Sequence, residues 1–459
     1  MSDTPAKSGA GKPSSAVIVG LGRTGLSCAR YLRAHGWKLA VTDSRPQPPE
    51  LERLRELDAS IPVRVGGLDT RLLDDAVCVV ASPGVSLADP FFAEARERGL
   101  EIVGDIELFA RAVDAPVVGI TGTNGKSTVT TLVGCMAERA KWRVRVGGNL
   151  GEPALDLLSA AQADAARTEL YVLELSSYQL EATLSLDLKA AAVLNVSPDH
   201  LDRYASVADY AAAKARIFAR CDTAVINLDD PLVAAMPRPG QRTLSFSLRA
   251  SIGADYAVAE RETAGGWWLT KRGEPLMPVS AMKLTGMHNV ANALAALALG
   301  EALGLPLPAM LEELASFGGL PHRAQWVAEV KGVAYIDDSK GTNVGATLAA
   351  IEGMPGPLVI IAGGDGKNQD FTPLREACRQ KVRLAILIGR DAPAIAAALE
   401  GACAVQRAAT LEEAVQAAAS AAQPGDTVLL SPACASFDMF RDYAHRGAVF
   451  ARAVKELAA

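Results

Sequence analysis

The chain has few cysteines, and nothing in their placement suggests a crosslink or a metal site. Its seven cysteines, at positions 28, 78, 135, 221, 378, 403 and 434, form no CxxC pair. An odd number at irregular spacing argues against a disulfide framework and against a structural zinc site. We therefore expect reduced cysteines in the interior or on helices.

Long apolar runs and basic clusters are also missing. No apolar run reaches the length that spans a membrane, and the first fourteen residues lack the apolar core of a signal peptide. We expect a flexible tail over residues 1–14, no membrane association and residence in the cytoplasm. The net charge of −6, without a basic run that carries interleaved aromatics, argues against a nucleic-acid partner.

What remains is the composition of an ordinary globular protein in a long chain. Hydrophobic residues make up 49% and charged residues 21% of the 459 residues, which provides ample apolar surface for packed cores. This length suggests about three domains. Strand and helix patterns alternate along three segments, separated near Pro116 and at a turn-rich stretch over 317–323. We predict an α/β protein with domains at 1–113, 114–320 and 321–459.

The first segment reads as a strand, a glycine-rich turn, a helix and a second strand over residues 16–43. Gly20, Gly22 and Gly25 fit the G-x-G-x-x-G fingerprint, and Asp43 falls near the position of a ribose-binding acid. The pattern alone is weak. It predicts that a diphosphate can lie at the helix start, and it leaves open a nicotinamide cofactor or a nucleotide-linked substrate.

Residues 121–128, TGTNGKST, form the most informative motif, because they follow an apolar run and precede a helical pattern. Glycines let the backbone approach an anion, the helix start offers unpaired amides, and Lys126 adds a charge. Ser127 or Thr128 could hold magnesium. The glycine spacing differs from the full Walker pattern, and a turn made for packing is the alternative. Adjacent glycine, lysine and two hydroxyls favour a nucleoside triphosphate site.

The rest of the middle segment has near-continuous apolar strands at 169–177 and 191–197 and a long helical pattern at 286–303. Such strands suit a parallel sheet that is covered on both faces, with functional residues at the carboxyl ends of the strands. Residues 240–280 read instead as a small antiparallel excursion. We therefore expect a parallel sheet with one antiparallel addition.

Acidic and imidazole groups follow these middle strands. Glu174 could bind magnesium, and His200, between Asp199 and Asp202, could orient a second ion or an acyl phosphate. A lone histidine is more often a structural loop residue, but these neighbours favour a site. Lys214 lies in an alanine-rich helical pattern, where the simplest interpretation is an exposed surface lysine.

The third segment resembles another doubly wound sheet, and polar loops follow three of its strands. The loops lie at 337–343, 363–371 and 431–440. Lys340 and Lys367 could bind carboxylates or phosphates, Thr342 and Ser436 could donate to them, and Asp338 could accept from a ribose or an ammonium. Three such loops at one sheet edge indicate a site.

Taken in order, these motifs resemble those of the Mur ligases over nearly the whole chain. The resemblance rests on GLGRTGLS, TDSRPQPP, ASPGV, TGTNGKST, GGNLGEP, LELSSYQLE, SPDHLDRY, the lysine of AAAKARI, MHNVANALAA, PHR, DDSKGTN, GGDGKNQDF and SPACASFD. It implies an N-terminal Rossmann-like domain, a central P-loop ATPase-like domain with a parallel sheet, and a C-terminal Rossmann-like domain.

The resemblance also implies an activity, that of an ATP-dependent amide ligase in peptidoglycan precursor synthesis. The carboxylate of UDP-N-acetylmuramoyl-L-alanine would take the γ-phosphoryl group of ATP, and the amine of D-glutamate would then displace phosphate. The implied cofactors are ATP and Mg²⁺, and we expect a monomer. The closest match within the family is to the members that add D-glutamate.

Residue roles follow from the same resemblance. The nucleotide would be held by Gly122, Thr123, Asn124, Gly125, Lys126, Ser127, Thr128, Asn292, Arg323 and Asp338. Catalysis would fall to Lys126, Glu174, His200 and Lys214, and metal binding to Ser127, Glu174, His200 and Lys214, with Lys214 as a carbamate. The UDP-linked substrate would contact Gly22, Arg23, Thr24, Asp43, Ser82 and Asn149. Asn149 and His200 would lie beside the carboxylate of this substrate. D-glutamate would contact Lys340, Thr342, Lys367, Ser436 and Tyr443.

Other readings stay open at this point. Folylpolyglutamate synthase has a similar phosphate loop, but the first segment and the loops of the third fit it poorly. A nicotinamide-dependent oxidoreductase would use the three glycines of the first segment, and a nucleotide-regulated binding protein would be expected to lack the glutamate, histidine and lysine set. Arg23 and Tyr443 stand where some relatives carry apolar residues.

Overall fold

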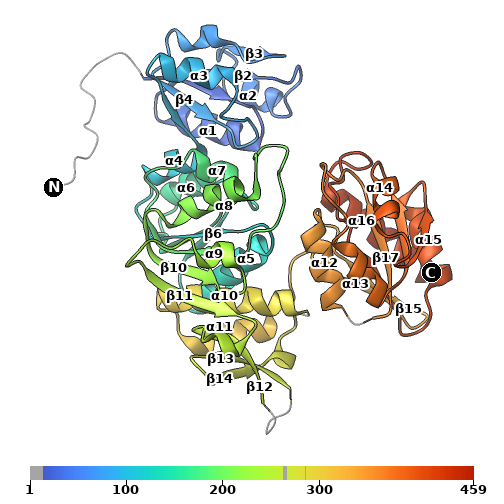
Figure 1. Cartoon of the computed structure of the whole chain (residues 1–459). Helices are drawn as coiled ribbons and strands as arrows, with labels where there is room; N and C mark the ends of the chain where they lie inside the picture. The colour runs from blue at the N-terminus through green and yellow to red at the C-terminus, as the bar shows by residue number, and fades with distance from the viewer. Residues whose placement is uncertain (1–13, 262–265, 285, 355, 459) are drawn as a thin grey trace. The chain divides into compact units, whose positions relative to one another are not determined.

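The computed structural model describes residues 14–261, 266–284, 286–354 and 356–458, and Figure 1 labels its elements. The expected tail, residues 1–14, lies outside the described residues except for Ser14. The fold is α/β with three sheets, as predicted. The chain forms two compact units, one made of the residues up to Gly119 with Trp142–Lys189 and Ala219–Asp222, the other of Ile120–Lys141, Ala190–Phe218 and the residues from Thr223 onward.

The N-terminal sheet has the order β3-β2-β1-β4-β5, and every neighbouring pair is parallel. Its strands are β1 Ser15–Val19, β2 Lys38–Asp43, β3 Val63–Val65, β4 Cys78–Ala81 and β5 Glu101–Val103. The direction of strand order reverses between β1 and β4, and crevices at such switch points are the usual ligand sites of open parallel sheets. The predicted βαβ unit is confirmed.

The glycine turn after β1 is fixed by close packing. A Cβ atom on Gly25 would lie 2.1 Å from the carbonyl oxygen of Gly20. Only glycine lets the first turn of α1 come this close to the strand end. Beyond the turn, Val17 and Val19 on one face of β1 pack with Phe92 of α3 in a buried cluster.

A nine-stranded sheet follows, with the order β14-β13-β12-β11-β10-β9-β6-β8-β7. Its strands are β6 Val117–Thr121, β7 Val144–Gly148, β8 Leu170–Glu174, β9 Leu188–Val193, β10 Cys221–Asn227, β11 Arg242–Ser247, β12 Tyr256–Glu260, β13 Trp267–Lys271 and β14 Glu274–Pro278. The predicted antiparallel excursion is confirmed for β12 to β14. It was wrong for β11, which pairs in parallel with both β10 and β12.

The C-terminal sheet has the order β15-β16-β20-β17-β18-β19, with only β15 antiparallel to its neighbour. Its strands are β15 Gln325–Val330, β16 Val333–Asp337, β17 Leu358–Gly363, β18 Val382–Ile388, β19 Ala404–Arg407 and β20 Thr427–Leu430. Along β17, Leu358 and Ile360 belong to one buried cluster and Val359 and Ile361 to the other. This alternation shows a sheet covered on both faces, as the apolar strands predicted.

Helices connect these strands. Those of the first unit are α1 Arg23–Ala34, α2 Leu51–Leu57, α3 Pro90–Glu97, α4 Asp105–Ala110, α6 Ala154–Ala163 and α7 Ser177–Glu181. Those of the second are α5 Lys126–Arg139, α8 Val207–Ala215, α9 Pro231–Ala234, α10 Met287–Leu303, α11 Leu307–Ser316, α12 Val344–Gly353, α13 Leu374–Lys381, α14 Ala392–Ala398, α15 Leu411–Ala421 and α16 Tyr443–Ala458.

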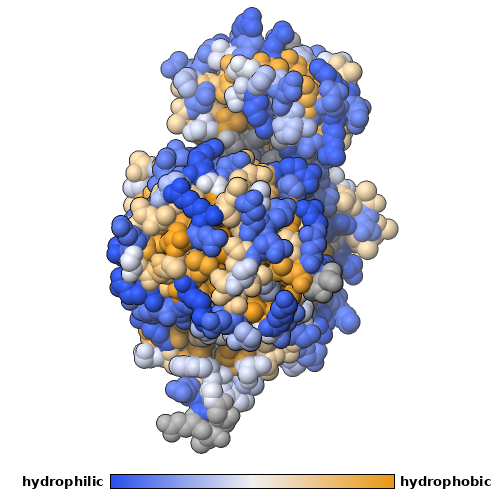
Figure 2. Space-filling view, turned by 90° about the vertical axis from the view of Figure 1, so that its right-hand side faces the viewer, coloured by the Kyte–Doolittle hydropathy of each residue, from blue (hydrophilic) through white to orange (hydrophobic). Residues whose placement is uncertain are grey.

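The surface is ordinary for a globular chain. On the face drawn in Figure 2, hydrophilic residues are interspersed with hydrophobic ones, which gather over the middle of the view. In the described part of the chain, no helix combines the length and the apolar character needed to cross a lipid bilayer. All seven cysteines are described and are free thiols, five of them buried, as expected.

Candidate active site

The phosphate loop, residues 121–128, joins β6 to α5, and its glycines make the connection possible. Gly122 and Gly125 have φ angles of 151° and 84°, which side chains disfavour. A Cβ atom on Gly125 would lie 2.3 Å from Oδ1 of Asn292. Helix α5 begins at Lys126, so its first amides and its positive dipole end border the loop. The local structure is that of an anion-binding turn.

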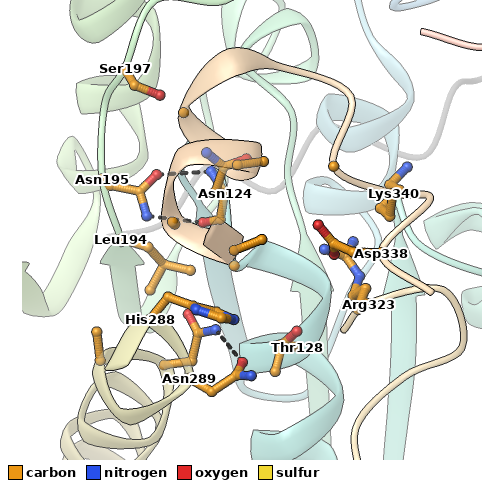
Figure 3. Close-up of a pocket in the computed structure, with 18 of the residues that line it drawn as sticks. Asn124, Thr128, Leu194, Asn195, Ser197, His288, Asn289, Arg323, Asp338 and Lys340 are labelled. Atoms are coloured by element: carbon orange, nitrogen blue, oxygen red, sulfur yellow. Dashed lines mark hydrogen bonds between the residues drawn. The ribbon is translucent and has the colours of Figure 1, made fainter. Parts of the chain in front are cut away.

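Residues that follow β9 hold this loop in place. The side chain of Asn195 accepts from the Asn124 amide at 2.8 Å and donates to the Asn124 carbonyl at 3.1 Å. Figure 3 shows both bonds. The Thr123 hydroxyl accepts from the amide of Ser197 at 3.0 Å. The loop is therefore preorganised by the neighbouring chain.

Two lysines converge on the loop. The ammonium of Lys126 donates to the carbonyls of Gly122 and Thr123 at 2.9 and 2.8 Å. That of Lys214 donates to Gly122 at 2.9 Å and lies 4.3 Å from the ring centroid of Tyr210. Lys214 is 1% exposed, so its interpretation as a surface lysine was wrong. The small residues of α8 let this helix bury its lysine against the loop.

A cavity of about 300 Å³ lies beside the loop. Asn124, Thr128, Asn292, Arg323 and Asp338 line it. Figure 3 shows side chains from the loop, from α10 and from the start of the third segment around one space. Arg323 donates to the hydroxyl of Ser127 at 2.6 Å. The cavity is thus lined by six of the ten residues that the resemblance assigned to a nucleotide.

Asp338 has a perturbed carboxyl group. Desolvation raises its pKa to about 7, although the Ser431 hydroxyl, the Ala324 amide and Arg323 favour the ionised form. The Ser431 hydroxyl donates at 2.7 Å. A carboxyl of this kind can accept from a hydroxyl-bearing ligand or share a proton with it.

His200 lies just past the loop-holding segment in a left-handed conformation, with φ of 57°. Desolvation lowers its pKa, which the charge of Asp199 opposes and that of Lys367 reinforces. Lys367 Nζ and His200 Nε2 lie 3.8 and 3.7 Å from the carboxylate oxygens of Asp199. Asp199 also accepts from Asn343 at 3.4 Å. The third segment thereby contributes Lys367 and Asn343 to the surroundings of His200.

Of the remaining predicted residues of the third segment, Lys340, Thr342 and Ser436 lie on the predicted loops, and Tyr443 begins α16. Lys340 Nζ lies 3.8 Å from the ring centroid of Tyr443, a cation–π arrangement. Thr342 is half-buried and Ser436 is buried. Sequence reasoning missed Arg446, which is fully buried and donates to the hydroxyl and carbonyl of Ser339. Burial lowers its pKa to about 10.

A second cavity, of about 460 Å³, lies in the first unit at the switch point of the N-terminal sheet. The predicted residues that line it are Gly22, Arg23, Thr24, Asp43, Ser82 and Asn149. Ser82 donates to the Gly20 carbonyl at 2.7 Å, and Arg23 donates to the Gly151 carbonyl at 2.7 Å. We call this space the switch-point cavity.

Asp43 is the acid of the fingerprint, and its carboxylate is already engaged. It accepts from the Leu21 amide at 2.6 Å and from the Arg45 side chain at 2.9 and 2.6 Å. Burial opposes ionisation, but the hydrogen bonds from Arg45 and Leu21 outweigh it and lower the pKa of Asp43. Arg45, which the sequence did not single out, therefore belongs to this cavity.

Asn149 and Glu174 are paired in the first unit. The Asn149 side chain donates to a carboxylate oxygen of Glu174 at 2.7 Å, and its amide donates to the Glu174 carbonyl at 2.8 Å. Glu174 is 3% exposed at the end of β8. This places a buried carboxylate next to the rim of the switch-point cavity.

A ready-made metal centre is not present in the described ranges, which contain no group of three histidine, cysteine, aspartate or glutamate side chains able to hold an ion. The donor chemistry fits magnesium only in part. The Ser127 hydroxyl and the Glu174 carboxylate are oxygen ligands of the kind Mg²⁺ prefers. Lys214 as an ammonium cannot be a ligand, whereas a carbamate on the same nitrogen would supply oxygens.

Three family models match successive segments of this chain. The family model "Mur ligase MurD-like, N-terminal domain" matches residues 14–104, "Mur ligase middle domain" matches 120–300, and "Mur ligase, glutamate ligase domain" matches 322–434. A UDP-N-acetylmuramoylalanine–D-glutamate ligase of Nitrosococcus oceani is 52% identical over 96% of this chain and 97% of its own. The ligase of that name from Pseudomonas aeruginosa is 51% identical over 96% and 98%.

Solved structures show the same fold at low identity. UDP-N-acetylmuramate-alanine ligase MurC of Thermotoga maritima aligns with a TM-score of 0.61 at 18% identity, over 96% of this chain and 99% of that one. MurF of Acinetobacter baumannii aligns with a TM-score of 0.59 at 18% identity, over 96% and 90%.

Proposed function

The chain belongs to the Mur ligase family. We propose that it joins D-glutamate to UDP-N-acetylmuramoyl-L-alanine with cleavage of ATP to ADP and phosphate. We further propose that it acts in the cytoplasm as a monomer. The observation that carries this is the near-full-length identity of 51–52% to ligases of that name. The preorganised phosphate loop supports it. The products would be the dipeptide conjugate, ADP and phosphate.

The nucleotide would occupy the cavity beside the phosphate loop. Loop amides and Lys126 would bind the phosphates, in place of the loop carbonyls that Lys126 now contacts. Asn292, Arg323 and Asp338 would bind the nucleoside, because they line the same cavity. Asp338 can accept from a ribose hydroxyl.

Magnesium would be held by Ser127, Glu174, His200 and a carbamylated Lys214. When bound, the ion would neutralise charge on the transferring phosphoryl group. The chain itself contributes the cation of Lys126, which favours the same negative charge without a metal. The carbamate on Lys214 is part of the proposal.

The two substrates would enter at different places. The switch-point cavity would hold the uridine diphosphate, with Gly22, Arg23 and Thr24 at the start of α1, beside Asp43 and Ser82. Asn149 and His200 would lie beside the carboxylate that receives phosphate. D-glutamate would be held by the cationic and hydroxyl groups of the third segment: Lys340, Thr342, Lys367, Ser436 and Tyr443. We propose domain limits at 1–113, 114–320 and 321–459.

The alternatives lose their support. A nicotinamide oxidoreductase would not match Mur ligase models along all three segments, and the match of residues 14–104 to a MurD-like N-terminal domain disfavours folylpolyglutamate synthase. The phosphate loop with its two lysines also argues against a binding protein without catalysis.

The test is phosphate release from ATP with magnesium and UDP-N-acetylmuramoyl-L-alanine. D-glutamate, L-glutamate, L-alanine and no amino acid are compared. We expect release that requires D-glutamate. Release that requires another amino acid would assign a different acceptor, and no release with any of them would contradict the proposed ligase activity.

A further inference from the structure

Asp105 is a buried carboxylate that the proposed chemistry leaves without a role. It is the first residue of α4 and is 2% exposed. Its Oδ2 accepts from the side-chain amide of Gln179 at 2.9 Å. Its Oδ1 is buried and has no hydrogen-bond partner among the described residues. Buried polar groups are normally satisfied, so this arrangement needs an explanation.

Gln179 belongs to α7 and lines the switch-point cavity. Its Oε1 accepts from the amide and the hydroxyl of Ser176 at 3.0 and 3.1 Å, and its Nε2 donates to Asp105. The two ends of the planar amide are therefore distinguished by their partners. Gln179 is 3% exposed. A primary amide has two N–H donors, and the structure assigns one of them to Asp105.

Attachment of α4 to the segment after α7 does not depend on Asp105. Glu107, in the same helix, accepts from the amides of Leu184 and Ser185 at 2.7 and 2.9 Å and from the Ser185 hydroxyl at 2.8 Å. Within the described ranges, Asp105 forms no ion pair that would offset its desolvation. Burial raises the pKa of its carboxyl to about 6. As a purely structural element this group is costly.

We propose that Asp105 is a positioning residue for the UDP-linked substrate. It holds the amide nitrogen of Gln179 on the cavity side, so that the remaining Nε2–H donates to an acceptor oxygen of that substrate. The oxygen and nitrogen of a glutamine amide are nearly the same size. The Ser176 amide holds the Gln179 oxygen, and Asp105 fixes the nitrogen end of the same group. Without Asp105 the side chain keeps only one of these two anchors, so its nitrogen is no longer held in place for a ligand acceptor. The inference rests on the proposed function for the identity of the ligand.

The test measures binding of UDP-N-acetylmuramoyl-L-alanine by calorimetry without ATP, and the KM for each substrate in turnover. Asp105→Ala and Gln179→Ala should each weaken binding roughly tenfold, the effect of losing about one well-placed hydrogen bond. The double variant should bind no more weakly than Gln179→Ala. The KM for ATP and the kcat at saturating substrate should stay near those of the wild type.

Two further variants separate positioning from structure. Asp105→Asn keeps an acceptor for Gln179 and should bind within about twofold of the wild type. Glu107→Gln perturbs the same helix without contact to Gln179, so it should lower stability and leave affinity for the UDP-linked substrate unchanged.

Three results would overturn the inference. They are wild-type affinity in folded Asp105→Ala, equal loss of affinity in Glu107→Gln, and additive losses in the double variant. If Asp105→Ala does not fold, wild-type affinity in Gln179→Ala would also overturn it. Failure of the wild-type protein to bind the UDP-linked substrate would instead reject the proposed function.

Discussion

Lys126 and Lys214 share one acceptor, since the carbonyl oxygen of Gly122 lies 2.9 Å from each of their Nζ atoms. One lysine starts the helix after the phosphate loop, and the other reaches the loop from α8. Two cationic side chains at one buried carbonyl concentrate positive charge where α5 begins. The charge of Lys126 is complementary to the γ-phosphate of a nucleotide and to the negative charge that develops on it during transfer. The proposed carbamylation would replace the cation of Lys214 with an anion that can hold magnesium.

Lys126→Ala should lower the rate of phosphate release by about 10²- to 10³-fold, the typical cost of removing one electrostatic donor at a reacting centre. Affinity for the UDP-linked substrate, measured by calorimetry, should persist because that site lies in the first unit. Lys189→Ala is the matched control, since Lys189 is exposed and pairs with Asp222 on the surface. Near wild-type release by Lys126→Ala would remove Lys126 from catalysis.

The proposed carbamate on Lys214 can be tested by NMR and by substitution of this lysine. The neutral amine adds to carbon dioxide with loss of a proton, and ¹³C-bicarbonate should then give a carbamate carbon signal by NMR. Lys214→Arg, which keeps the charge but forms no such carbamate, should lose the signal and lower activity by roughly 100-fold or more. An active arginine variant would show that positive charge suffices at this position.

Two glycines of the N-terminal turn should respond differently to alanine. A Cβ on Gly25 would lie 2.1 Å from the Gly20 carbonyl oxygen, whereas nothing lies within 4 Å of one on Gly22. Gly25→Ala should lower the free energy of unfolding by about 1–3 kcal/mol, the usual cost of overpacking. Gly22→Ala should change it by less than about 0.5 kcal/mol. Urea unfolding measures both, and equal losses would contradict the packing argument.

The fold was largely predictable because apolar periodicity and glycine turns determine it locally. The strand at 38–43 and the helix at 286–303 were predicted to within a residue of β2 and α10. The strand predicted over 169–177 was too long, since β8 ends at Glu174. There the Ser176 side chain caps the next helix through Gln179, and a capping box ends a strand whose apolar pattern continues.

The site was predictable at the level of motifs and less so at the level of contacts. The phosphate loop carries its chemistry in its own residues, so the sequence revealed it. Asn195 and Asn343 were missed because their importance lies in partners that are distant in sequence. Lys214 and Arg446 resemble exposed residues of amphipathic helices, and both are buried. Only tertiary packing decides which helix face carries a buried cation.

The stability of the protein should depend on pH through Asp105. Burial raises its pKa from 3.8 to about 6, so the folded chain keeps a proton that the unfolded chain releases above about pH 4. The free energy of unfolding therefore falls as pH rises from about 4 to 6, and this loss is complete above the folded pKa. Asp105→Asn cannot titrate. Its unfolding free energy relative to the wild type should increase by up to about 3 kcal/mol between pH 4 and pH 7, because each pKa unit is worth 1.36 kcal/mol. Urea unfolding across this range measures the trend.

Asp370→Asn should give a trend of opposite sign, since hydrogen bonds from Thr372 lower the pKa of Asp370. A difference for Asp105→Asn that does not change with pH would show that the carboxyl titrates alike in both states and would contradict the prediction.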